Sequence, residues 1–98
     1  MTIREIQSGG VLSLALTGEL DLTGGPELTA FLEGKLSGTE KLVLDMQEVR
    51  YISSAGIRAV LAAKKSMGER EVCLAHCNEM VTEAFEVTGL DEFFTMEA

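Results

Sequence analysis

Two adjacent serines, Ser53 and Ser54, stand in the stretch YISSAGIRAV, where a predicted strand gives way to a predicted helix. A serine hydroxyl can attack a substrate when a histidine serves as its base, cap the free amides of a helix, or accept a phosphate. The only histidine, His76, falls in or just after a later strand, and neither serine lies in a Gly-x-Ser-x-Gly turn. The sequence therefore favours capping or phosphorylation over hydrolysis, and we expect no enzymatic activity.

The helix start that carries these serines is bare of bulky side chains. One serine is enough to cap a helix, which is worth ~1 kcal/mol, yet two stand here and small Ala55 and Gly56 follow them. We expect this turn to be open to close approach by the backbone of another protein. A phosphate there adds a charge of about −2. The helix dipole tolerates this charge, but it disrupts binding to a partner whose surface is matched to a neutral hydroxyl. The pattern predicts a binding surface that one covalent charge can switch.

The charge balance restricts the partners. The formal net charge is −8 at pH 7, whereas nucleic acids and anionic membrane surfaces both demand a basic face. We therefore expect no nucleic acid and no membrane among the partners. Basic residues nevertheless gather between residues 50 and 70, which hold Arg50, Arg58, Lys64, Lys65 and Arg70. This segment is either a solvated helix face or a docking surface for an acidic partner, and the sequence leaves both open.

Three other groups of residues carry weaker signals. The stretch CLAHC places Cys73 and Cys77 around His76 but supplies neither a fourth ligand nor the usual spacing of a metal site. We interpret these cysteines as buried thiols and expect no metal.

The Gly-rich GELDLTGG lacks the Gly-Lys-[Ser/Thr] ending of a phosphate-binding loop, so we expect no cofactor. A neighbouring pair of carboxylates such as Glu19 and Asp21 arises by chance among 16 acids.

The sequence also indicates a compartment and a domain count. Two unpaired cysteines suit a reducing compartment. The N-terminus has no basic-then-apolar leader, and the apolar runs are only a few residues long. We therefore expect a cytoplasmic protein that consists of one domain, residues 1–98, around a single core.

Strands are predicted from alternation and from short apolar runs. Residues 11–18, VLSLALTG, alternate between large and small side chains, and Gly9-Gly10 predicts a hairpin turn that pairs them with an edge strand at 3–7. The runs at 41–46 and 71–76 predict short buried strands, and 92–96 predict a last one.

Helices are predicted from apolar spacing and from end signals. The first begins at Pro26 and ends at Gly38, the second covers about 54–67, and the third follows an Asn78 cap and ends at Gly89. The residues of this third helix that are expected to face the core are Val81, Ala84, Phe85 and Thr88. This order predicts an α/β fold: a single-domain mixed sheet, an antiparallel hairpin followed by parallel strands, with three to four helices. The loops GELDLTGG and EVRYISSAG then meet at the carboxyl edge of the sheet.

Three segments together resemble a known family over nearly the whole chain. They are LTGELDLTGGPEL, LVLDMQEVRYISSAGIRAVLAA and the ending Gly89–Phe94, and they resemble the STAS domain of bacterial anti-sigma factor antagonists. The resemblance implies a protein that binds an anti-sigma factor which is also a serine kinase, and so frees the sigma factor. Phosphorylation of a serine at the start of the second helix ends the interaction, and a metal-dependent serine phosphatase restores it.

The family pattern assigns roles to individual residues. It places the phosphoacceptor at Ser54 and puts Asp21 in the neighbouring loop. Ser53 stands where the family usually has Asp and offers a competing hydroxyl. Ser53, Ser54, Ala55, Gly56, Arg58 and Asp21 are the expected partner-binding residues. The alternative implied by the family is a non-enzymatic STAS subunit of a membrane transport complex, in which the same helix surface docks on an ATPase.

Overall fold

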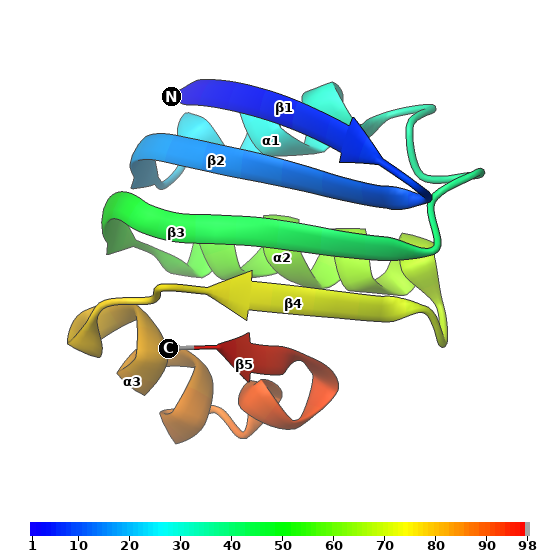
Figure 1. The fold of residues 1–98 in the computed structure, drawn as a ribbon. Helices are drawn as coiled ribbons and strands as arrows, with labels where there is room; N and C mark the ends of the chain where they lie inside the picture. The colour runs from blue at the N-terminus through cyan, green and yellow to red at the C-terminus, as the bar shows by residue number, and fades with distance from the viewer. Residues whose placement is uncertain (98) are drawn as a thin grey trace.

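The computed structural model, which describes residues 1–97, is built on a five-stranded mixed sheet (Figure 1). The first two strands form an antiparallel hairpin, and every later strand runs parallel to its neighbour. In spatial order the strands are β1 (Thr2–Ser8), β2 (Val11–Leu20), β3 (Lys41–Ile52), β4 (Glu71–Ala75) and β5 (Thr95–Glu97). The predicted fold class is confirmed.

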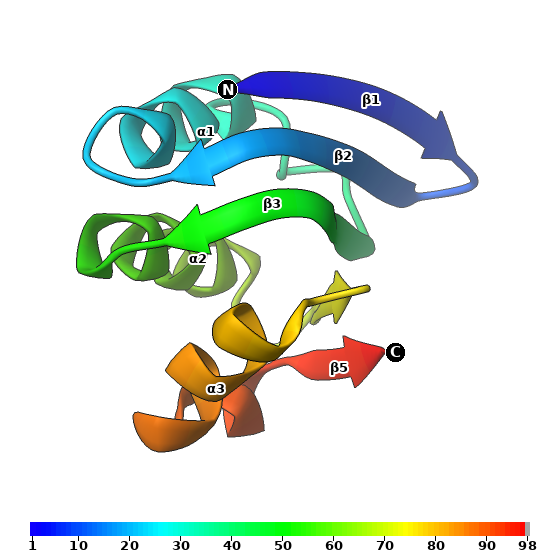
Figure 2. The same cartoon turned by 90° about the vertical axis from the view of Figure 1, so that its left-hand side faces the viewer.

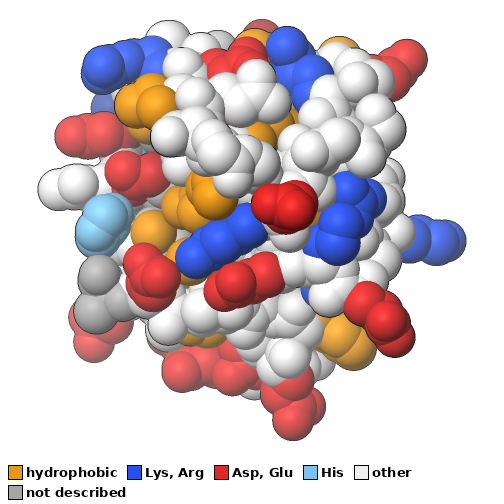
Figure 3. Space-filling view, turned by 45° about the vertical axis from the view of Figure 1, so that its right-hand side comes forward, with side chains coloured by type: hydrophobic (Ala, Val, Ile, Leu, Met, Phe, Trp, Pro, Cys, Tyr) orange, Lys and Arg blue, Asp and Glu red, His pale blue; other side chains and the backbone are white. Residues whose placement is uncertain are grey.

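Two helices, α1 (Gly24–Leu32) and α2 (Ser54–Met67), lie side by side on one face of this sheet (Figures 1 and 2). A third helix, α3 (Glu79–Val87), and a 3-10 turn at Leu90–Phe93 lead from β4 into β5. No helix covers the opposite face in the described part of the chain. Figure 3 views that side of the molecule obliquely and shows charges of both signs interspersed among small apolar patches.

The core lies between the sheet and the helices, as the alternation in β2 predicts. Leu12, Leu14 and Leu16 are buried there, while the residues between them face the uncovered side. The rings of Phe85 and Phe94 meet edge to face with centroids 5.5 Å apart, which fastens α3 to the segment before β5. Within residues 1–97, no helix has both the length and the apolar composition needed to cross a membrane.

The N-terminal cap of α3 is also confirmed. Asn78 Oδ1 accepts a hydrogen bond from the Val81 amide at 2.8 Å, as an N-cap side chain does. Its Nδ2 donates to the Val49 carbonyl oxygen at 3.1 Å, so the cap also ties α3 to β3.

Two strands are longer than predicted. The third strand does not stop at residue 46 but continues to Ile52, and β2 continues to Leu20. The ladder between them carries register shifts between Ala15 and Thr17 and between Gly18 and Glu19. Such register shifts interrupt the alternation of inward-facing and outward-facing residues from which strands are predicted. As a result residues 18–20 of the expected loop GELDLTGG and residues 48–52 of EVRYISSAG belong to strands, and Ser53 follows β3 directly.

Other departures concern the helix ends and the last strand. Helix α1 ends at Leu32 rather than near Gly38, because the chain turns at Gly34, whose φ is 78°. Leu36 is still buried, from the loop that follows. Thr88 does not face inward: it is exposed, and its hydroxyl donates to the Ala84 carbonyl oxygen at 2.9 Å. The last strand was expected at 92–96, but it begins only at Thr95. Residues 92 and 93 belong to the 3-10 turn, and Phe94 ends that turn.

Candidate functional site

The candidate site is the junction where β3 ends and α2 begins. The Ser53 amide donates to the Leu20 carbonyl oxygen at 2.9 Å, and the Ile57 amide donates to the Ser53 carbonyl oxygen at 2.9 Å. Ser53 thus belongs both to the end of the sheet and to the first turn of α2. Ser54 is the first residue of the helix, where the backbone amides have no partner within the helix.

The two serines are placed differently. The Ser54 side chain is exposed at the carboxyl edge of the sheet. The Ser53 Oγ is buried, makes no capping bond, and has no hydrogen-bond partner among the described residues. A modifying enzyme can therefore reach the Ser54 hydroxyl directly, whereas the Ser53 hydroxyl must first rotate outward.

Gly56 does not have the role that the sequence suggested. It was expected to leave the helix start open to a partner, but it is buried and faces the end of β2. A Cβ at this position would clash with the Leu20 carbonyl oxygen and come within 2.7 Å of the Leu20 carbonyl carbon. The residue is glycine because the backbone of α2 packs on the backbone of β2. The expectation of open space at Gly56 is therefore wrong.

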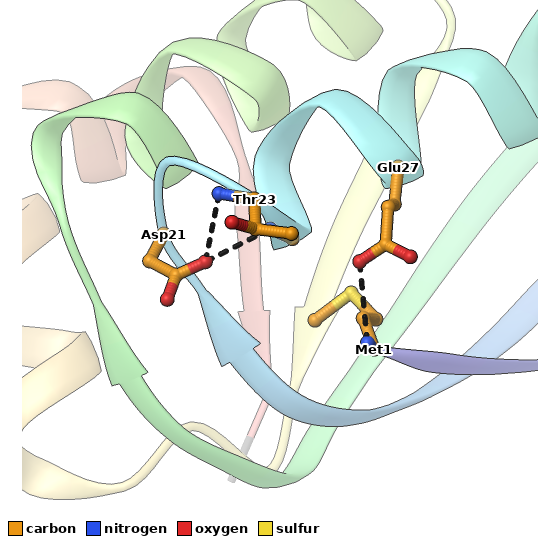
Figure 4. A network of polar contacts seen from close by, with 5 residues as sticks. Met1, Asp21, Thr23 and Glu27 are labelled. Carbon is orange, nitrogen blue, oxygen red and sulfur yellow. Dashed lines mark hydrogen bonds and ion pairs between the residues drawn. The ribbon is translucent and has the colours of Figure 1, made fainter.

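The loop between β2 and α1 is held in a fixed turn by Asp21. One carboxylate oxygen, Oδ1, accepts hydrogen bonds from the amides of Gly24 at 2.8 Å and Thr23 at 3.0 Å (Figure 4). These bonds, with the one from Gly24 the stronger influence, hold the pKa of Asp21 below its ordinary value. The carboxylate is thus engaged by its own loop and shapes the surface next to Ser54 by fixing that loop.

Helix α1, which follows this loop, begins against the first turn of α2. A Cβ at Gly25 would lie 2.9 Å from the Ala55 carbonyl oxygen, so the first turns of α1 and α2 are in close contact. Beside this contact Leu22 is 78% exposed. The sequence did not predict the close packing of Gly25 or the exposure of Leu22. The adjacent glycines before Pro26 were the available signal for the close approach, but a turn explained them equally well.

The basic segment between residues 50 and 70 divides into two groups. Arg70 is structural: its guanidinium donates to the carbonyl oxygens of Leu36, Thr39, Ser66 and Met67 at 2.6–3.0 Å. Lys64 donates to the Arg70 carbonyl oxygen at 2.9 Å. Arg50, Arg58 and Lys65 are exposed and form no ion pair within residues 1–97.

Of the two cysteines expected to be buried, only Cys73 is fully so. Cys73 is buried in β4 and Cys77 is half-buried just after it. Burial, the largest cause in both, raises the pKa of each thiol to about 11, so neither is ionised near neutral pH. His76 Nδ1 lies 3.1 Å from Asp45 Oδ1.

Comparison with known proteins identifies the family. Residues 3–98 match the model of the STAS domain, and the chain therefore belongs to the STAS domain family. Its sequence is 33% identical over 88 residues to a Bordetella bronchiseptica protein named as an anti-sigma factor antagonist, BtrV. That match covers 87% of this chain and 76% of the relative.

Solved structures share the fold at low sequence identity. An anti-sigma factor antagonist from Mycobacterium paratuberculosis superposes with a TM-score of 0.87 at 21% identity, over 98% of this chain and 84% of that one. The phosphorylated form of the Bacillus cell fate determinant SpoIIAA gives 0.78 at 16% identity, over 99% and 91%. A sulfate transporter family protein from Wolinella succinogenes gives 0.80 at 18% identity, over 94% and 80%.

Proposed function

We propose that this protein is an anti-sigma factor antagonist that works by partner switching. In its unphosphorylated state it binds an anti-sigma factor that is also a serine kinase. The kinase transfers the γ-phosphoryl group of ATP to the Ser54 Oγ, which loses its proton, and ADP leaves. The phosphate ends the interaction, and a serine phosphatase removes it by hydrolysis. The protein itself is a cytoplasmic binding module and catalyses no step.

The position of Ser54 is the observation that carries this proposal. It is an exposed hydroxyl at the first residue of a 14-residue helix, beside a second hydroxyl, that of Ser53, which is enclosed. No acidic residue lies in the first turn of α2, so the helix dipole and the free amides are available to a phosphate. The family and the relative BtrV support the same reading.

The structure also suggests why a phosphate would release a partner without unfolding the protein. Ser54 points to solvent, so the added group displaces nothing from the core. A partner seated on the helix start would instead have to desolvate a charge of about −2. The surface expected to be covered is formed by Ser54, Ala55, Arg58 and the loop that Asp21 fixes.

Phosphorylation with site mapping tests the proposal. The purified protein is incubated with ATP and an anti-sigma factor kinase from its own organism, and peptides are mapped by mass spectrometry. We expect the phosphate on Ser54. The Ser54→Ala variant should fold and bind the kinase, because Ser54 is an exposed residue inside the first turn rather than the N-cap and its side chain contributes at most about 0.5 kcal/mol, but ATP should no longer release it. Phosphate on Ser53 in either protein would contradict the assignment.

A second candidate function is a STAS subunit of a membrane transport complex. The similarity to the sulfate transporter family protein from Wolinella succinogenes favours it. In that case the helix surface docks on transporter components and Ser54 is never modified. The genes beside this one distinguish the two functions: a kinase or phosphatase of sigma-factor regulation supports partner switching, and transporter subunits support the alternative.

A further inference from the structure

We propose that Arg58 captures the phosphate on Ser54 and that this capture withdraws Arg58 from the partner. The inference deepens the proposed function by naming the residue through which phosphorylation changes the surface. Before phosphorylation Arg58 is free to pair with a carboxylate of the partner. After phosphorylation it pairs within its own helix.

The spacing of the two residues brings them together. Ser54 and Arg58 are four residues apart on α2, so their side chains are neighbours on one face of the helix. Both are exposed. A negative group placed N-terminal to a cation at this spacing is the favourable order for an ion pair on a helix.

Arg58 has no competing partner in the described structure. It forms no ion pair there and donates no side-chain hydrogen bond, in contrast to Arg70, whose guanidinium donates to four carbonyl oxygens. The acid of the β2–α1 loop, Asp21, accepts hydrogen bonds from the Thr23 and Gly24 amides. Because an unpaired arginine on the phosphate's own helix face costs little to reorient, the phosphate is its best available partner.

The surroundings of Arg58 indicate what it binds before phosphorylation. With Leu22 and Pro26 it lines an open groove of about 530 Å³ between α1 and the start of α2. Glu33 lies in the same lining, on the α1 side. An acidic partner segment is attracted at Arg58 and repelled by most of a chain whose net charge is −8. The occupant that fits is a segment of the anti-sigma factor kinase that presents an apolar side chain beside a carboxylate.

Titration of the phosphate tests the capture without any partner. Phosphoserine is installed at position 54 during translation, and its second pKa is followed by phosphorus NMR in wild type, Arg58→Gln and Lys65→Gln. Lys65→Gln removes the same charge from the same helix, but 11 residues away, which is about 16 Å along the axis. Arg50, exposed at the end of β3, is unchanged in all three proteins.

We expect the phosphate pKa to be lower in wild type than in Arg58→Gln by about 0.15–0.4 units at low salt. The difference should shrink as salt is added, and Lys65→Gln should match wild type. Equal values in wild type and Arg58→Gln would refute the capture. Because the phosphate is installed directly, a positive titration with a protein that no kinase modifies would leave the capture standing and overturn the proposed function.

Discussion

The packing of Gly56 leads to a stability prediction that opposes helix propensity. Alanine is favoured over glycine in a helix interior by ~1 kcal/mol, so propensity alone makes Gly56→Ala stabilising. In the structure the new Cβ would come within 2.7 Å of the Leu20 carbonyl carbon and 2.8 Å of the Leu20 Cβ. Carbon atoms in contact normally lie 3.5–4.0 Å apart, so α2 and the end of β2 must separate by about 1 Å.

The size of the effect follows from overpacking. Forcing extra carbon into a packed site costs typically ~1–3 kcal/mol, and here the obstacle is backbone, which yields less than a side chain. After the gain in propensity we expect a net loss of about 2 kcal/mol. For a chain of this size that corresponds to a melting temperature roughly 8–16 °C lower.

Thermal and urea unfolding, followed by circular dichroism, measure this loss. Gly38→Ala is the matched control, because a Cβ there meets nothing within 4 Å and the backbone is not left-handed. It should be as stable as wild type or slightly more stable, since alanine restricts the unfolded chain. A Gly56→Ala protein that melts at or above the wild-type temperature would show that the close approach of α2 to β2 is incorrect.

Three further predictions concern the polar contacts that fix the fold around the site. Asn78→Ala should lower the free energy of unfolding by about 1–2 kcal/mol in urea, because it removes the cap of α3 and the bond to Val49. Arg70→Lys should cost about 2 kcal/mol, because one ammonium cannot satisfy the four carbonyl oxygens that the guanidinium reaches. The lowered pKa of Asp21 means that its stabilisation is present above its ordinary pKa of 3.8 and lost as pH falls through the lower folded value. Wild type should thus be more stable than Asp21→Asn at pH 6, and unfolding curves taken at pH 6, 4 and 2 should converge toward acid.

Much of the fold could be predicted from the sequence because local signals and tertiary structure agree there. The alternating leucines of β2, the Gly9-Gly10 hairpin and the Asn78 cap each depend on a few adjacent residues. The end of β3 could not be predicted in the same way. Its residues 47–51 are mostly polar and follow a register shift, so they show no alternating pattern of their own. They are strand because they pair with the neighbouring strand β2.

The candidate site was predictable in position but not in construction. Its serines were located from their types and from the family pattern. That Gly56 packs on Leu20 and that Gly25 packs on Ala55 are facts of packing between segments 30 or more residues apart, and the burial of the Ser53 hydroxyl is likewise not visible in the sequence. Composition cannot distinguish a glycine that leaves room for a partner from one that leaves room for the protein's own backbone. Burial decides it, and burial here is set by how α2 meets β2.

This construction limits how phosphorylation at Ser54 could act. The first turn of α2 is fixed to the sheet by the bond between the Ser53 amide and Leu20 and by the contact at Gly56. Moving it by about 1 Å costs ~1–3 kcal/mol, as an overpacked core does. A phosphate at an exposed helix start gains only ~0.3–1 kcal/mol from the dipole and ~0.2–0.5 kcal/mol from an i, i+4 pair such as that with Arg58. Together these gains, about 0.5–1.5 kcal/mol, fall in the lower half of that cost or below it, so the phosphate is expected to leave the helix in place and to bias an exposed side chain that is free to rotate. Release of a partner should therefore leave the backbone in place and change only the charge pattern that the partner meets.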